Sequence, residues 1–264
     1  MLNAIYVWGV AGSRLARVHL RIEDHDRQRS RPQFEQAIIE DLAWLGFAAD
    51  GERVRQSDRD AIYTSALDRL RAAGLVYACG CSRAEIAMGQ SASDELRYPG
   101  TCSEKHLDER PGRGLRVRLA PEAVSFIDRR HGPLTQQPSE QCGDLLLKDR
   151  DGNWTYQFAA TVDDFDQDVT LVIRGDDLLP STGRQIQLAR LLGRGRPPQF
   201  FHHVLIMKTP QQKLSKSDGD TGVRDLRAAG MSAAEVIGRA AFLGGLTKAF
   251  RPVAAAEVSS MIGA

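Results

Sequence analysis

A lysine-rich segment at residues 213–219 is the first candidate for chemistry. It reads KLSKSDG and places Lys213 and Lys216 three residues apart, with Ser215 between them. Two mobile ammonium groups beside a hydroxyl suit a phosphate whose charge moves during a reaction. The segment therefore predicts contact with a polyphosphate, and an ordinary polar loop is the alternative.

Acidic residues near the start of the chain are a second candidate. Glu23, Asp24 and Asp26 follow residues 18–22, which alternate in the manner of a short strand. Carboxylates at the end of a strand can bind an ammonium group. A salt-bridged turn between a strand and a helix has the same composition, so both interpretations stay open.

A phenol and a guanidinium form a third candidate in the second half of the chain. Tyr156 lies in WTYQFA and Arg174 lies in VIRGDD. A guanidinium pairs with a carboxylate through two parallel hydrogen bonds. If both side chains reach one cavity, they predict a ligand that carries a carboxylate; taken singly, each is more typical of a structural role.

Three cysteines indicate a metal site. Cys79 and Cys81 form a C-x-C pair, and Cys102 comes four residues after Tyr98. Thiolates are zinc ligands, and structural zinc takes four ligands in a tetrahedron. The fourth ligand stays open between Tyr98, whose phenol is an unusual ligand, and His106, which is a common one. Three unconnected reduced cysteines are the alternative.

These residues need a scaffold that brings distant segments together. Strand-like patterns at 18–22, 169–173 and 204–207 alternate with helix-like patterns on both sides of an irregular middle segment. The alternation predicts an α/β fold with a mostly parallel sheet, in which ligands bind beyond the carboxyl ends of the strands. We expect one helix to begin after Ser30, which would be its N-cap, and to end at Gly46. Its apolar residues form one stripe: Phe34, Ile38, Ile39, Leu42 and Leu45.

Composition narrows the class of protein. The chain has 35 Lys and Arg against 34 Asp and Glu, so its net charge does not indicate a nucleic-acid or membrane partner. Its 4 cysteines are too few for a disulfide-stapled secreted protein, and no apolar run approaches the roughly 18 residues of a membrane span. Residues 178–217 nevertheless hold seven basic and no acidic residues, a stretch that could meet phosphate. We expect a cytoplasmic monomer without a membrane partner.

Taken together, the motifs resemble those of the class I glutamyl-tRNA synthetases. RIEDHDRQRS, QSDRDAIY, YACGC, VDD, VIRGDDLLPSTGRQIQL and KLSKSDG occur in one order over about residues 3 to 220. The chain stops soon after KLSKS, without the anticodon-binding region of the long members. It is similar in this to short members that activate glutamate with ATP and attach it to queuosine in the anticodon of tRNA(Asp).

The resemblance implies a fold and roles for particular residues. The fold would be Rossmann-like, with residues 1–75 and 151–222 as its two halves, a zinc-containing insertion at 76–150 and a helical tail at 223–264. Glu23 would hold the glutamate ammonium group, and Tyr156 and Arg174 would bind the rest of the amino acid. Lys216 would contact a phosphate of ATP, with Lys213 and Ser215 supporting the loop, and Mg²⁺ is expected at the phosphates. Zinc would be bound by Cys79, Cys81, Tyr98 and Cys102.

One part of the family pattern is missing. The family begins with a strand, a Pro-Ser/Thr-Gly turn and a His-x-Gly-His element, and none of these precedes RIED. We expect the natural protein to carry a further N-terminal segment, and a chain that truly lacks the first strand to be poorly stable and weakly active. Two alternatives to the tRNA-modifying enzyme are a fragment of a glutamyl-tRNA synthetase and a non-catalytic, zinc-stabilised tRNA-binding relic.

Overall fold

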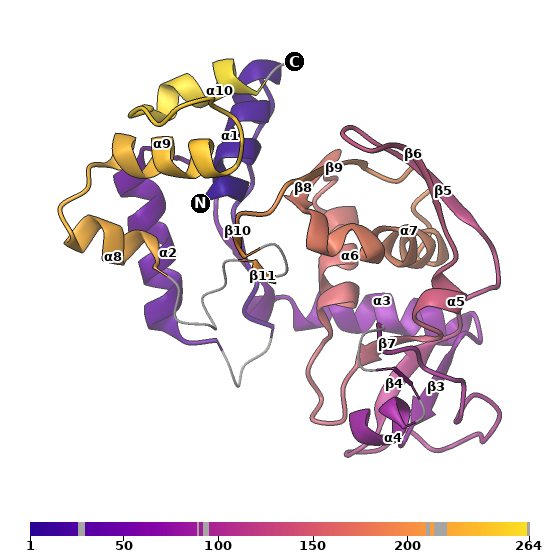
Figure 1. Cartoon of the computed structure of the whole chain (residues 1–264). Helices are drawn as coiled ribbons and strands as arrows, with labels where there is room; N and C mark the ends of the chain where they lie inside the picture. Colours follow the sequence, from indigo (N-terminus) through magenta and orange to yellow (C-terminus); the bar gives the residue numbers. More distant parts are fainter. Residues whose placement is uncertain (26–29, 89, 92–94, 210–211, 214–220, 263–264) are drawn as a thin grey trace.

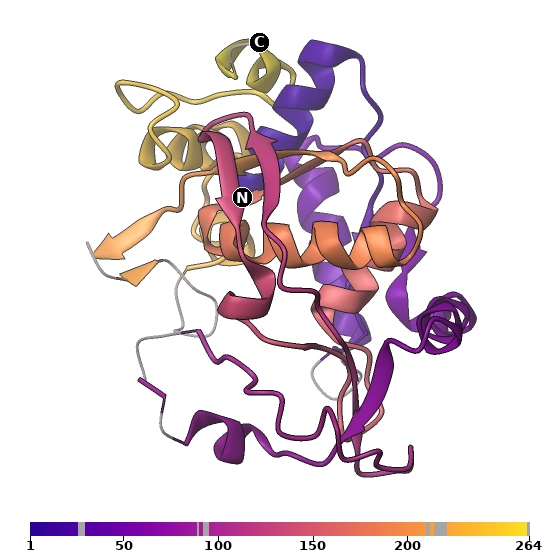
Figure 2. The same cartoon turned by 90° about the vertical axis from the view of Figure 1, so that its right-hand side faces the viewer.

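The computed structural model describes residues 1–25, 30–88, 90–91, 95–209, 212–213 and 221–262. Within these residues, helices surround several small sheets (Figures 1 and 2). None of the helices in these ranges is both long enough and apolar enough to cross a membrane.

The largest sheet has four strands in the order β6-β5-β9-β8. Strands β8 and β9 are parallel, β5 joins β9 in parallel, and β6 returns antiparallel to β5. Helix α7 connects β8 to β9, as expected for a parallel α/β unit. The elements are β5 (Val124–Asp128), β6 (Gly132–Gln136), α6 (Tyr156–Asp166), β8 (Leu171–Gly175), the 3-10 helix η2 (Asp176–Ser181), α7 (Thr182–Leu191) and β9 (Gln199–His203).

A second parallel pair carries the acidic residues near the start of the chain. Strand β1 pairs with β2, and helix α2 lies between them in sequence. The 3-10 helix η1 and helix α3 follow directly. These elements are β1 (Arg21–Ile22), α2 (Pro32–Leu45), β2 (Val54–Arg55), η1 (Gln56–Asp58) and α3 (Asp60–Ala72).

The middle segment forms an antiparallel sheet in the order β3-β4-β7. Its elements are β3 (Val76–Cys79), α4 (Arg83–Ala87), β4 (Gly114–Val117), α5 (Pro138–Gln141) and β7 (Leu145–Lys148). Strands β5 and β6, from the same stretch of sequence, instead extend the sheet that contains β8 and β9. The range 76–150 is therefore not an insertion throughout, because part of it completes the larger sheet.

Helices and a hairpin make up the last part of the chain: β10 (Met207–Thr209), β11 (Gln212–Lys213), α8 (Val223–Ala228), α9 (Ala233–Leu243), the 3-10 helix η4 (Ala255–Glu257) and α10 (Val258–Met261). Helices α9 and α10 pack against α1 (Leu2–Arg14), so the two ends of the chain lie side by side (Figure 1). The expected helical tail is thus part of one core with the N-terminal helix, which includes Ile5, Ile237 and Val258.

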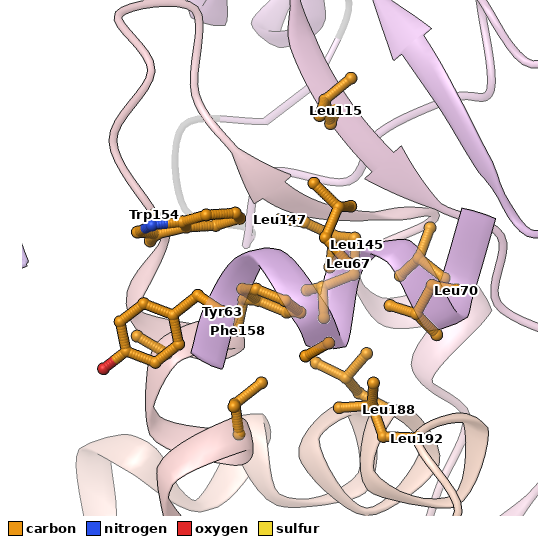
Figure 3. Packing of buried hydrophobic residues seen from close by; sticks show 14 of the residues in the cluster. Tyr63, Leu67, Leu70, Leu115, Leu145, Leu147, Trp154, Phe158, Leu188 and Leu192 are labelled. Carbon is orange, nitrogen blue, oxygen red and sulfur yellow. The ribbon is translucent and has the colours of Figure 1, made fainter. Parts of the chain in front are cut away.

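A separate core joins α3, α6 and α7 to the antiparallel sheet. Figure 3 shows Leu67 and Leu70 of α3 close to Leu145 of β7 and to Leu188 of α7. Tyr63 belongs to the same cluster, and its hydroxyl points out of it. This core fixes α6, whose first residue is Tyr156, relative to α3.

Two expectations about local structure were wrong. Residues 204–206 are not a strand; β9 lies just before them, at Gln199–His203, where two histidines obscure the apolar pattern. Arg31, rather than Ser30, is the N-cap of α2. The apolar stripe of α2 is also not fully buried, since Phe34 is 56% and Ile38 is 41% exposed.

Gly238 on α9 supports a sharp prediction about stability. A Cβ atom there would lie 1.9 Å from the backbone oxygen of Arg251, which cannot move as a side-chain tip can. We expect Gly238→Ala to lower the free energy of unfolding by about 3 kcal/mol through overpacking. Gly195→Ala is the control, because a Cβ at Gly195 meets nothing within 4 Å. Chemical denaturation measures both, and equal stability of the two variants would contradict the close packing of α9.

Candidate active site

A cleft of about 1400 Å³ is lined by elements from the start of the chain and by β8. Its lining comes from α1, β1, α2, α6 and β8, and it includes Glu23, Tyr156 and Arg174. The volume exceeds the roughly 300–1,000 Å³ of a usual small-molecule site. The exposed residues Phe34 and Ile38 of α2 also line this cleft.

Glu23 lies just after β1 and stays accessible to a ligand. Its side chain is 41% exposed, and its carboxylate is 3.2 Å from the guanidinium of Arg21. Arg21 is itself held by Asp164, at 2.8 Å, and by Gln167, at 3.4 Å. The pKa of Arg21 is raised because the carboxylates of Asp164 and Glu23 outweigh the effect of burial. Arg21 therefore stays charged and fixes the strand end from which Glu23 projects.

The other acidic residues of this segment are used structurally. Asp24 accepts hydrogen bonds from the backbone N–H of Ser57, at 2.8 Å, and from its hydroxyl, at 2.6 Å. The nitrogen Nδ1 of His25 lies 2.6 Å from Oε1 of Gln56. Asp26 lies outside the described residues. Both sequence-based interpretations thus apply, since Asp24 belongs to a bonded turn while Glu23 remains open to the cleft.

A buried carboxylate behind Glu23 was missed from the sequence. Asp163 of α6 has no exposed surface and accepts hydrogen bonds from Gln56, Arg59 and Tyr63 at 2.7 to 3.0 Å. These donors come from η1, from α3 and from Arg59 between them, so Asp163 links this segment to α6. The VDD motif that contains it was the available indication.

Arg174 is buried in β8 and lies among neutral acceptors. Its Nε donates to Nε2 of His202 at 2.9 Å, Nη1 donates to Oε1 of Gln185 at 2.6 Å, and Nη2 donates to Oγ1 of Thr182 at 2.8 Å. Burial lowers the pKa of Arg174. Among the described residues it forms no ion pair, so its positive charge is available to an anion in the cleft.

Tyr156, at the start of α6, lies within electrostatic reach of both other groups. Its pKa is raised first by burial and then by the carboxylate of Glu23, while the guanidinium of Arg174 lowers it. The hydroxyl therefore stays protonated and can act as a hydrogen-bond donor. An acid, a phenol and an unpaired guanidinium on one cleft can together hold a molecule that has both an ammonium and a carboxylate group.

The cysteines lie together in the antiparallel sheet and the loop beside it. The Sγ atoms of Cys79, Cys81 and Cys102 are all within 4.8 Å of one another. The hydroxyl of Tyr98 is 3.4 Å from Sγ of Cys79 and accepts a hydrogen bond from the backbone N–H of Cys102. Zinc bound by thiolates at about 2.3 Å spaces them about 3.8 Å apart, so the cluster fits zinc with Tyr98 as the fourth group.

The surroundings shift the thiol pKa values of the cluster in opposite directions, and burial together with the neighbouring thiols raises the pKa of Cys81 to about 11. Burial would raise the pKa of Cys102, but hydrogen bonds from Gly80 and Tyr98 and from the other thiols lower it to about 7. The guanidinium of Arg116 lies 3.7 Å from the ring centre of Tyr98 and supplies positive charge. His106 is exposed, and the cluster of possible ligands among the described residues does not include it.

The described residues include only part of the lysine-rich segment. The backbone of Lys213 pairs in β11 with β10. Ser215 and Lys216 lie outside the described residues, so their expected contact with ATP stays a prediction.

Comparison with known proteins agrees with this geometry. Residues 2–254 match the family described as tRNA synthetases class I (E and Q), catalytic domain. The chain belongs to this family of ligases. This membership agrees with the α/β fold and with the parallel strands beside the cleft.

Individual relatives carry more specific names. Proteins named glutamyl-Q tRNA(Asp) synthetase are 44% identical in Janthinobacterium sp. (strain Marseille), over 76% of this chain and 70% of the relative, and in Bordetella bronchiseptica, over 83% and 70%. A glutamate tRNA ligase from Elizabethkingia meningosepticum, solved in complex with its amino acid, is 26% identical with a TM-score of 0.79. The match covers 98% of this chain and 60% of that ligase.

Proposed function

We propose that this chain activates L-glutamate with ATP and transfers it to queuosine in the anticodon of tRNA(Asp). The observation that carries the proposal is the cleft shared by Glu23, Tyr156 and Arg174. Glutamate has one ammonium and two carboxylate groups, which match an exposed acid and an unpaired guanidinium. The names of the 44% identical relatives support queuosine as the acceptor.

The proposed reaction has two steps, activation of glutamate and its transfer. A carboxylate oxygen of glutamate attacks the α-phosphorus of ATP, the bond to the β-phosphate oxygen breaks, and pyrophosphate leaves. A hydroxyl of the modified base then attacks the activated carbonyl and gives up its proton to solvent, an ester forms, and AMP leaves with the bonding electrons. Such phosphoryl chemistry depends on positioning and on charge stabilisation, and Mg²⁺ at the phosphates would supply part of that charge. Glu23, Tyr156 and Arg174 would hold the amino acid, while Lys216, Lys213 and Ser215 would act on the phosphates.

Zinc has a structural role in this proposal. Cys79, Cys81, Tyr98 and Cys102 would hold the ion, which would cross-link β3 to the loop that contains Cys102. The ion would lie in the antiparallel sheet, whereas the proposed chemistry takes place in the cleft.

A transfer assay tests the proposed acceptor. The full chain is incubated with ATP, radiolabelled glutamate and one of three RNAs: tRNA(Asp) with queuosine, the same tRNA with guanine in its place, and tRNA(Glu). We expect label only on the queuosine-containing tRNA, and we expect its stability in mild alkali to differ from that of a 3′ ester. Label only on the 3′ end of tRNA(Glu) would instead identify a glutamyl-tRNA synthetase activity. Retention of tRNA without glutamate-dependent ATP–pyrophosphate exchange would identify the non-catalytic relic.

A further inference from the structure

Three adjacent strands place polar side chains in a row behind the cleft. Asp128 is the last residue of β5, His202 lies in β9, and Arg174 lies in β8. The sheet register pairs Arg174 with His202 directly. Because β5, β9 and β8 are neighbours in the sheet, the three side chains can form a continuous hydrogen-bonded row.

The surroundings of Asp128 keep its carboxylate ionised and fixed in position. Its side chain has no exposed surface. Its Oδ1 accepts from the backbone N–H groups of Arg130 and His131, both at 3.0 Å. Its Oδ2 accepts from the backbone N–H of His202 at 3.1 Å and lies 2.7 Å from Nδ1 of the same residue. These hydrogen bonds lower the pKa of Asp128 although burial would raise it.

Arg174 and Asp128 determine where the proton of His202 lies; the hydroxyl oxygen of Thr182 is a third, longer contact, 3.3 Å from Nε2. Arg174 has only donors and presents its Nε–H to Nε2 of His202, so Nε2 must be the acceptor. The proton of the neutral ring is therefore on Nδ1, where it donates to Asp128. Burial lowers the pKa of His202, in agreement with a neutral ring.

This row orients a guanidinium that has no anionic partner among the described residues. His202, Gln185 and Thr182 together take three of the five N–H groups of Arg174. One N–H on each terminal nitrogen remains for Tyr156 and a ligand. Because a charge-assisted hydrogen bond to a carboxylate depends on where the planar guanidinium points its remaining N–H, we expect the acceptor at Nε to affect how tightly the ligand is bound.

We propose that His202, held in its Nδ1–H form by Asp128, is a positioning residue that fixes the plane of Arg174 for the substrate carboxylate. The choice of glutamate as that substrate rests on the proposed function. His202 does not touch the ligand; it acts through Arg174.

Two substitutions of His202 test its two ring hydrogen bonds one at a time. His202→Asn keeps a donor near the position of Nδ1 and removes the acceptor at Nε2, whereas His202→Gln can place its amide oxygen near Nε2. We expect the dissociation constant for L-glutamate, measured by titration calorimetry on the full chain, to rise about tenfold in His202→Asn and to stay within about threefold in His202→Gln. His203→Asn is the matched control, since His203 bonds instead to Asn3 and Val204.

A spectroscopic measurement tests the row without any ligand. In ¹⁵N-labelled protein we expect an Nδ1–H ring for His202 and an Arg174 Nε–H that exchanges slowly with water. That slow exchange should be lost in His202→Asn and kept in His202→Gln.

The outcomes distinguish this inference from the proposed function. Wild-type affinity in His202→Asn, or an Nε2–H ring in the wild type, would overturn the role of His202 while leaving glutamate as the ligand. If the wild type binds no glutamate, the proposed function fails. The inference about His202 is then tested by two measurements alone: which ring nitrogen of His202 carries the proton, and how fast the Nε–H of Arg174 exchanges with water.

Discussion

Replacing Arg174 by glutamine is expected to weaken the binding of L-glutamate by at least about a hundredfold. Arg174 forms no ion pair among the described residues, and it is buried beside the cleft. Arg21, another guanidinium of the cleft, is already bound to Asp164. A carboxylate that enters the site of Arg174→Gln therefore loses its hydration without gaining a charged partner.

Two further variants test whether the effect depends on the charge and the planar shape of Arg174. Arg174→Lys keeps the charge but not the planar fork, so we expect a loss of about tenfold. Arg190→Gln removes an exposed charge from the last turn of α7 and should bind glutamate as the wild type does. Titration calorimetry measures all three. Unchanged affinity in Arg174→Gln would show that the carboxylate binds elsewhere.

Loss of bound zinc is the second large effect that we expect. Cys79→Ser and Cys102→Ser each remove a thiolate from a cluster whose sulfur atoms lie within 4.8 Å of one another. Because structural zinc needs four ligands, we expect the zinc content to fall from one ion per chain to almost none. Limited proteolysis should also become faster near Cys102, since its loop loses the link to β3.

Cys142→Ser is the control for the metal site. Cys142 is buried, but its Sγ donates to backbone oxygens of Pro138 and Gly143 and is not part of the cluster. Elemental analysis of the purified proteins should find zinc in this variant as in the wild type. Purified wild-type chain without zinc would contradict the assignment of all four ligands.

The helices were the most predictable part of the fold. Helices α3 and α9 follow from apolar residues at helical spacing, because each buries one face against a core. Strand β9 could not be located in the same way. It reads QFFHH, and its histidines are buried only because Asp128 and Asn3, from distant parts of the chain, bond to their rings.

In the candidate site, too, residues within local motifs could be predicted, and residues whose role depends on distant partners could not. Glu23, Tyr156 and Arg174 could be selected from motifs, and the structure places them on one cleft. Asp128 could not, because its role depends on His202, which lies 74 residues further along the chain. Its position at the end of the alternating segment VSFID was the only indication in the sequence, and the prolines nearby obscured that strand.

The packing of α1 against α9 and α10 has a consequence for synthesis on the ribosome. Leu2, Ile5 and Val10 of α1 are buried in a core completed by Ile237 and Val258. At usual elongation rates, roughly ten to forty seconds separate the emergence of these two sets of residues. The apolar face of α1 is without its final partners during that interval, so we expect the nascent chain to expose this face until α9 and α10 have emerged.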